Sequence, residues 1–242
     1  MSDDATRIEE IAAISYAFED RPWSFASEAA PAIDAHWRKL VAQNPRLSNG
    51  RVLMMHRFAL QQQAGGLVLK GACLQAEYKA FLSWRDFGFP DRDIWNCFAM
   101  PALRSADGAF ILGEMSPFTA NPGRIYFPAG TPEPGDIVGD SVDLEGNILR
   151  ELEEETGLGA ADITLHSGWT ATFVGARIAC MKIVQSPLPA ATLVARIATF
   201  LEQEREPELT RVVPVFSPDD FDERNMPDFT LTYLRHVFAV DR

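Results

Sequence analysis

Apolar positions in the first third of the chain follow two kinds of pattern. Residues 31–45 place four apolar side chains on one helical face and end in an Asn-Pro step, which predicts a helix that stops there. Residues 51–63 and 67–75 are apolar, partly β-branched runs around paired glycines, a pattern typical of a β-hairpin. Residues 76–88 predict a second helix.

From residue 94 onward the pattern changes to short apolar runs broken by tight turns. The predicted strands cover residues 94–105, 109–115, 123–130, 163–174, 176–185 and 210–216. Helical periodicity predicts helices over residues 143–156, 190–204 and 229–239. These elements indicate an α+β protein. We expect an N-terminal α+β extension over residues 1–92 that packs on a second unit over residues 93–242.

Composition and charge narrow the class of protein. The 242 residues are 47% hydrophobic and 23% charged, as in a soluble globular protein. A formal net charge of -12 argues against binding to nucleic acid or to an anionic membrane, because both need a basic surface. The chain starts without a basic-then-apolar leader and no apolar run is long enough to span a bilayer, so a cytoplasmic location is expected. Cys73, Cys97 and Cys180 lack metal-ligand spacing and are expected to be buried free thiols.

The most unusual segment is the acidic stretch RELEEETGL, residues 150–158. In a helix, Glu151, Glu154 and Glu155 share one face, because they are three and four positions apart, whereas Glu153 points away. Like charges at this spacing repel, and they lie near the helix C-terminus, where the helix dipole disfavours anions. A bound divalent cation would relieve both costs, and magnesium prefers such oxygen ligands. The alternative is an ordinary solvated helix surface.

The neighbourhood of this helix favours the cation hypothesis. Gly157 stands where a left-handed residue would end the helix. Upstream, the segment FPAGTPEPGD, residues 127–136, supplies a strand end and a loop whose glycines let the backbone approach a ligand closely. A strand, a glycine loop and an acidic helix in this order are more specific than the glutamates alone.

These residues resemble the signature of the Nudix hydrolase family. That signature is a Gly, five residues, a Glu, seven residues, and then Arg-Glu-apolar-any-Glu-Glu-any-Gly-apolar. Its second half is matched throughout, by Arg150, Glu151, Leu152, Glu154, Glu155, Gly157 and Leu158. In the first half, Gly130 matches and Asp136 replaces the usual Glu. Arg150 follows Asp136 by fourteen positions instead of eight, so six extra residues must loop out before the helix.

The resemblance implies an α/β/α sandwich, with a mixed sheet between helices, and the hydrolysis of a nucleoside diphosphate linked to another moiety. A looser similarity, through TPEP at residues 131–134 and the N-terminal extension, is to the Nudix enzymes that hydrolyse UDP-glucose. ADP-ribose is an alternative substrate. The implied cofactor is Mg²⁺ or Mn²⁺.

The resemblance also implies roles for particular residues, while others are suggested by position. Catalytic roles would belong to Glu151 and Glu154, with Arg150 orienting the glutamates by ion pairing. The implied metal ligands are Glu151, Glu154, Glu155 and the Gly130 carbonyl, with Glu208 as a further acidic candidate outside the motif. Arg124, Phe127 and Trp169 are candidate substrate contacts, although strand aromatics more often pack in the core. The general base is left open.

Two alternatives stay open from the sequence. The lengthened loop and Asp136 are compatible with a non-catalytic Nudix-like module that binds a nucleotide as a sensor or regulator. The N-terminal part could form a lid, a wall of the substrate site or the surface of a homodimer. The expected partner in either case is a nucleotide-linked small molecule.

Overall fold

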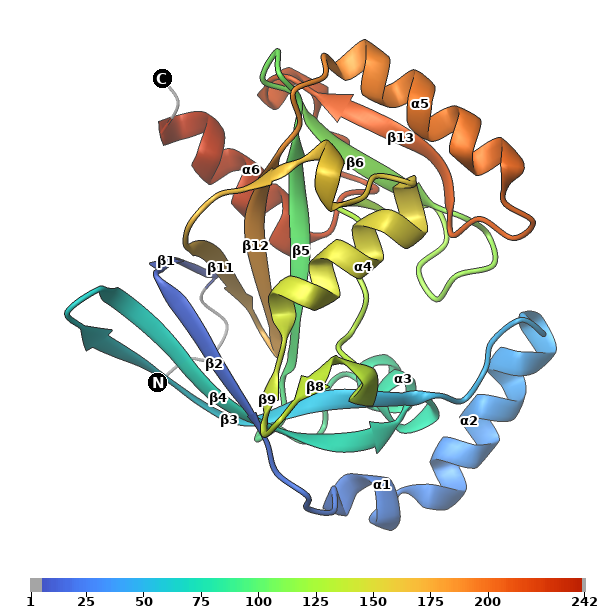
Figure 1. Cartoon of the computed structure of the whole chain (residues 1–242). Coiled ribbons are helices and arrows are strands. Elements are labelled where there is room, and N and C mark those ends of the chain that lie inside the picture. Colours follow the sequence, from blue (N-terminus) through green and yellow to red (C-terminus); the bar gives the residue numbers. More distant parts are fainter. Residues whose placement is uncertain (1–5, 241–242) are drawn as a thin grey trace.

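The computed structural model describes residues 6–240, which form two β-sheets with helices packed around them (Figure 1). The larger sheet contains, in spatial order, β1 (Arg7–Ile11), β11 (Trp169–Val174), β12 (Arg177–Gln185), β5 (Asn96–Arg104), β6 (Phe110–Met115) and β13 (Leu209–Val215). Two short strands are attached to it, β10 (Thr164–Leu165) beside β12 and β7 (Ile125–Tyr126) beside β6. β12 and β5 run parallel and the other pairs are antiparallel, so the sheet is mixed.

The smaller sheet brings together strands from distant parts of the chain. Its spatial order is β3 (Arg51–Gln63), β4 (Gly66–Glu77), β2 (Ala13–Phe18), β9 (Ser141–Val142) and β8 (Ile137–Val138). Around it lie α1 (Ser24–Glu28), α2 (Ala30–Gln43) and α3 (Tyr78–Asp86). Because β1 joins the larger sheet and β8 and β9 join the smaller one, each sheet takes strands from both sides of residue 92.

Helices cover both faces of the larger sheet. α4 (Leu144–Thr156) and α5 (Ala190–Gln203) lie on one face and α6 (Asp228–Val240) on the other (Figure 1). Their apolar sides bury the largest hydrophobic core, which includes Leu152, Ile197 and Tyr233. The expected arrangement of a mixed sheet between helices is therefore confirmed. Short 3-10 turns occupy Pro134–Asp136, Ala160–Asp162 and Pro218–Asp220.

The predicted hairpin and helices are present with ends shifted by a few residues. Two predicted strands are shorter than expected for physical reasons. Residues 163–174 are interrupted at Gly168, whose φ of 72° turns the chain, and β7 ends before Pro128, which has no N–H to donate. Strands β1 and β2 were not anticipated, because residues 7–18 mix charged and apolar positions without a clear alternation.

A second core lies between the two sheets and contains all three cysteines. Cys73, Cys97 and Cys180 are free thiols and fully buried, which confirms the expectation. Burial raises the pKa of the Cys73 thiol to about 12, so this thiol is unreactive at neutral pH. Of the helices within residues 6–240, none is long and apolar enough to cross a membrane.

Candidate functional site

The acidic helix is α4, and its ends are set by the residues that flank it. The Asp143 side chain caps the first turn by accepting a hydrogen bond from the Gly146 N–H at 2.9 Å. Gly157 ends the helix with φ of 69°, a conformation that favours glycine. Leu144, Ile148 and Leu152 are buried against the sheet. The adjacent part of the helix surface, which carries Glu151 and Glu155, is therefore held against the loop that follows β7.

The three predicted ligand carboxylates differ in their surroundings. Glu155 is buried, and its Oε1 accepts a hydrogen bond from the Ala129 N–H at 3.0 Å. Its Oε2 is also buried but has no hydrogen-bond partner within residues 6–240. The Glu151 side chain is 12% exposed and that of Glu154 is 59% exposed. The helix thus presents carboxylates at three depths, from the protein interior to the surface.

Gly130 lies directly against this face. A methyl group at Gly130 would collide with the carboxylate of Glu151, so glycine lets the loop approach this carboxylate without displacing it. This close contact explains why a glycine suits this position of the motif, next to the carboxylates that it is proposed to join in binding a metal ion. Backbone atoms of the loop and carboxylates of the helix meet there.

Arg150 connects the carboxylates of the helix to Asp136. Its Nη1 lies 2.9 Å from Glu151 Oε1 and 3.1 Å from Glu154 Oε2, and its Nη2 lies 3.2 Å from Asp136 Oδ1. Asp136 is buried and also accepts hydrogen bonds from the Glu133 N–H and the Asn147 amide, at 2.9 and 3.0 Å. Asp136 therefore anchors both the glycine loop and the arginine.

The six extra residues before the helix form a small hairpin instead of disturbing the site. Residues 137–142 are the strands β8 and β9, joined by a turn in which Gly139 has φ of 63°. The hairpin returns the chain to its start, where the Asp143 N–H donates to the Asp136 carbonyl at 2.8 Å. At its tip, the Phe18 N–H donates to the Asp140 carbonyl at 3.0 Å. The hairpin of residues 137–142 therefore attaches the glycine loop to β2 of the smaller sheet.

Burial and mutual repulsion alter the acidity of this cluster. Burial, together with the charge of Glu154, raises the pKa of Glu151 to about 7, although Arg150 acts in the opposite direction. Burial raises the pKa of Glu155 well above its usual value, and the charges of Glu208 and Glu151 add to this effect. Burial, and then Glu154, also raise the pKa of Glu208. Without a cation, the site therefore holds protons near neutral pH.

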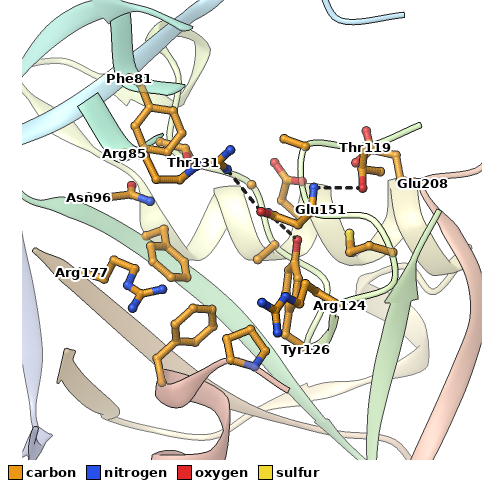
Figure 2. A pocket seen from close by; sticks show the side chains of 18 of the residues that line it. Phe81, Arg85, Asn96, Thr119, Arg124, Tyr126, Thr131, Glu151, Arg177 and Glu208 are labelled. Carbon is orange, nitrogen blue, oxygen red and sulfur yellow. Dashed lines mark hydrogen bonds between the residues drawn. The ribbon is translucent and has the colours of Figure 1, made fainter. Parts of the chain in front are cut away.

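Glu151, Glu154 and Glu208 line a cavity of about 690 Å³, whereas Glu155 is buried behind them. These three glutamates form one wall, and the cavity also contains three further guanidinium groups and several aromatic rings. Figure 2 shows Asn96 and Arg177 on the far side of the cavity from Glu208. The other residues that line the cavity include Arg85, Arg124, Arg177, Asn96, Phe81, Phe98, Tyr126, Phe229, Glu223 and Asp228. The cavity thus combines carboxylates with guanidinium groups, although the chain as a whole is strongly acidic.

Of the substrate contacts suggested by the sequence, only Arg124 lines this cavity, where its Nη1 donates to the Arg224 carbonyl at 2.9 Å. Phe127 is fully buried in the core, with its ring centroid 5.7 Å from that of Tyr233. Trp169 is buried below Lys182, whose Nζ lies 4.6 Å from the centre of the indole ring. The structure does not bring these two aromatic rings to the cavity. Glu208, by contrast, does lie beside the acidic helix.

Several polar residues of the cavity were not identified from the sequence, among them Arg85, Asn96 and Arg177. Arg85 belongs to α3, and its Nη1 donates to Asn121 Oδ1 at 3.2 Å. Asn96 and Arg177 are the first residues of β5 and β12, and they are paired in the register of the parallel strands. No motif marks these residues. They meet only because non-consecutive strands become neighbours in the sheet.

The donor chemistry of the acidic wall fits a divalent cation such as Mg²⁺. All of its side-chain donors are carboxylate oxygens, and the buried Glu155 Oε2 has no protein partner within the described chain. As placed, no three carboxylate, histidine or cysteine groups within residues 6–240 converge closely enough to hold a metal ion. Arg150 instead neutralises Glu151 and Glu154. Cation binding would therefore require these two side chains to turn from the arginine toward the cavity.

Comparison with known proteins gives matches only among solved structures. No family model and no curated protein sequence matches the chain. A Nudix hydrolase from M. Smegmatis, RenU, is similar over 60% of this chain and 83% of its own, with 14% identity and a TM-score of 0.39. The MutT protein from Methanosarcina mazei Go1 is similar over 61% and 96%, with 14% identity and a TM-score of 0.43. A NUDIX hydrolase from Nitrosomonas europaea is similar over 61% and 91%, with 19% identity and a TM-score of 0.39. The function is therefore inferred from the motif and the cavity.

Proposed function

We propose that this protein is a metal-dependent pyrophosphohydrolase of the Nudix type that cleaves a nucleoside diphosphate linked to another moiety, such as a nucleotide sugar. One observation carries the proposal. The segment RELEEETGL forms the last turns of α4 and its glycine cap, and Glu151 and Glu154, next to Gly130, line a large cavity that also contains three guanidinium groups from other segments. An ordinary solvated helix would not bury Glu155 with an unpartnered oxygen.

The acidic wall is the part that would hold Mg²⁺ or Mn²⁺. Glu151, Glu154, Glu155 and the Gly130 carbonyl are the proposed ligands, with Glu208 as an additional carboxylate at the same wall. When bound, such a cation neutralises the diphosphate and lowers the pKa of the attacking water. Glu155 is buried and the Glu151 side chain is only 12% exposed, so water screens their attraction for a cation less than it would at the surface.

The remaining residues of the site position these groups and attract the substrate. Arg150 is held by Asp136, so it can release a glutamate without losing its own place in the site. Elsewhere in the cavity, Arg85, Arg124 and Arg177 offer guanidinium groups to an anionic ligand, alongside Glu223 and Asp228. A diphosphate in the cavity would therefore lie between the metal ion held by the glutamates and the guanidinium groups of the arginines. The volume of about 690 Å³ suits a ligand of nucleotide-sugar size.

The test is a pair of variants in the same helix. Glu154→Gln with Glu155→Gln removes two ligand charges, whereas Glu153→Gln removes an exposed charge on the other side of the helix. We expect the double variant to lose Mg²⁺-dependent turnover of UDP-glucose and ADP-ribose and to lose Mn²⁺ binding in calorimetry. The Glu153→Gln protein should keep both properties.

The outcome also separates an enzyme from a sensor. If the double variant still hydrolysed the panel at the wild-type rate, the proposed catalytic role of this helix would be wrong. If the wild-type protein bound nucleotides without ever releasing phosphate monoesters, even with Mn²⁺, it would be a non-catalytic binding module.

A further inference from the structure

Three arginines from distant segments approach one another in the cavity. Arg85 belongs to α3, Arg124 to the loop between β6 and β7, and Arg177 to β12. Burial lowers the pKa of Arg177, against the effect of Asp228. The charges of Arg85 and Arg124 lower it further, so the three guanidinium groups lie close enough to repel one another. An anionic ligand among them would relieve this repulsion.

Arg85 is the most firmly positioned of the three. Its Nε donates to Asp86 Oδ1 at 2.8 Å, and its Nη1 donates to Asn121 Oδ1 at 3.2 Å. Its Nη2 has no hydrogen-bond partner within residues 6–240. A guanidinium group is planar and has N–H donors on all three nitrogens, so contacts at Nε and Nη1 fix its plane and leave the Nη2 donors for a ligand. Arg85 thus combines a fixed orientation with unused donors.

The other two arginines lack such an arrangement. Arg124 is exposed, and its Nη1 donates to the Arg224 carbonyl at 2.9 Å. Arg177 lies on the far side of the cavity from Glu208 (Figure 2), and its Nε is buried. Within the described chain, neither Arg124 nor Arg177 donates a hydrogen bond to a side chain that would fix the plane of its guanidinium group.

Both partners of Arg85 are themselves anchored. Asp86 Oδ2 lies 2.8 Å from His36 Nε2 on α2, and Asn121 Nδ2 donates to the Tyr126 hydroxyl at 3.1 Å. Tyr126 is a buried residue of β7, the strand that precedes the glycine loop. The contacts therefore run from α2 through α3 to β7, and they join the N-terminal part of the chain to the strand next to the acidic helix.

We propose that Arg85 binds a phosphate group of the substrate and that Asp86 and Asn121 are its positioning residues. This inference rests on the proposed function and assigns part of the site to the N-terminal part of the chain. Of residues 6–92, Arg85 is the charged one that lines the cavity. Figure 2 shows its side chain directed into the cavity. Phosphate oxygens accept parallel hydrogen bonds from a planar guanidinium group, which suits the donors that Arg85 has left.

The test measures binding of inorganic pyrophosphate by calorimetry in EDTA, which needs neither a metal nor turnover. Arg85→Met removes the guanidinium group and should raise the Kd at least about tenfold. Arg85→Lys keeps the charge but loses the planar donors, so its Kd should lie between those of wild type and Arg85→Met. Arg38→Met on α2 is the matched control, since Arg38 is exposed and does not line the cavity. It should bind as wild type does.

Asn121→Ala separates recognition from a structural role. It breaks the same hydrogen bond between α3 and the loop before β7 as Arg85→Met does, but it leaves the guanidinium group in the cavity. If Arg85 binds the anion, Asn121→Ala should weaken pyrophosphate binding clearly less than Arg85→Met does. A purely structural link would make both variants lose binding to the same extent.

Three results would overturn the inference. The first is no binding of pyrophosphate by the wild-type protein, and the second is an unchanged Kd in Arg85→Met. The third is an equal loss of binding in Asn121→Ala and Arg85→Met. These results leave the proposed hydrolase function untouched, because that function is tested by the glutamate variants. Conversely, if the glutamate variants kept turnover, a loss of pyrophosphate binding in Arg85→Met would still stand as a property of the cavity.

Discussion

Replacing Glu151 by Gln should change how the stability of the protein depends on pH. The folded-state pKa of Glu151 is raised from 4.5 to about 7, mainly by burial. The native protein therefore holds this proton more tightly than the unfolded chain does. As the pH rises from 4.5 to 7, the unfolded chain ionises first, and the free energy of unfolding falls.

The size of this effect follows from the two pKa values. A pKa difference of about 2.5 between unfolded and folded states corresponds to a loss of about 3.5 kcal/mol, at roughly 1.4 kcal/mol for each pKa unit. Most of this loss falls between pH 5 and pH 8. Glutamine cannot ionise, so the variant lacks the loss. The stability of the variant relative to wild type should therefore rise by about 2–3 kcal/mol from pH 5 to pH 8.

Urea unfolding at pH 5, 6, 7 and 8 measures this difference directly. The buffers should contain EDTA, because a bound cation would favour the ionised carboxylate. Any cost of losing the contact with Arg150 is nearly the same at each pH, since Asp136 and Glu154 continue to pair with the arginine. Glu153→Gln serves as the control with an exposed side chain. A difference between Glu151→Gln and wild type that stayed constant or shrank with rising pH would refute the reasoning.

Three further variants test the framework of the site. Gly130→Ala forces the adjacent flexible carboxylate aside, so it should lower turnover about 10- to 100-fold while the melting temperature, measured by calorimetry, changes little. Gly157→Ala strains a residue with φ of 69° and should lower the free energy of unfolding in urea by about 1–2 kcal/mol. Asp136→Ala removes the buried partner of Arg150 and should cost about 2–3 kcal/mol in the same assay; an unchanged midpoint would contradict the anchoring role.

The sequence predicted those features that depend on local spacing. The acidic face of α4 follows from helical periodicity, and the cap at Gly157 follows from the need for a left-handed residue. The hairpin of β3 and β4 follows from two apolar runs around a turn. Glu208 was anticipated from its place before a strand, and it does lie at the acidic wall.

The features that the sequence could not predict depend on contacts between distant segments. Asn96 and Arg177 become neighbours only through the parallel pairing of two strands that are 81 positions apart. Phe127 was considered for substrate contact, but the direction of its side chain is set by the course of the chain after β7, which turns it into the core. The ion pair between Asp136 and Arg150 depends on the hairpin of residues 137–142, because the pairing of β8 with β9 brings the start of α4 back to Asp136.

The pairing of β1 with β11 has a consequence for synthesis of the chain. Arg7 and Phe173 are register partners, so the first strand of the larger sheet cannot find its place until most of the chain has left the ribosome. Until then β1 has no partner in that sheet and remains exposed to chaperones and proteases. A shortened chain without residues 7–11 would leave β11 as an open edge that could pair with other molecules. Fusion partners and tags at the N-terminus should therefore be judged by their effect on the yield of soluble protein as well as on activity.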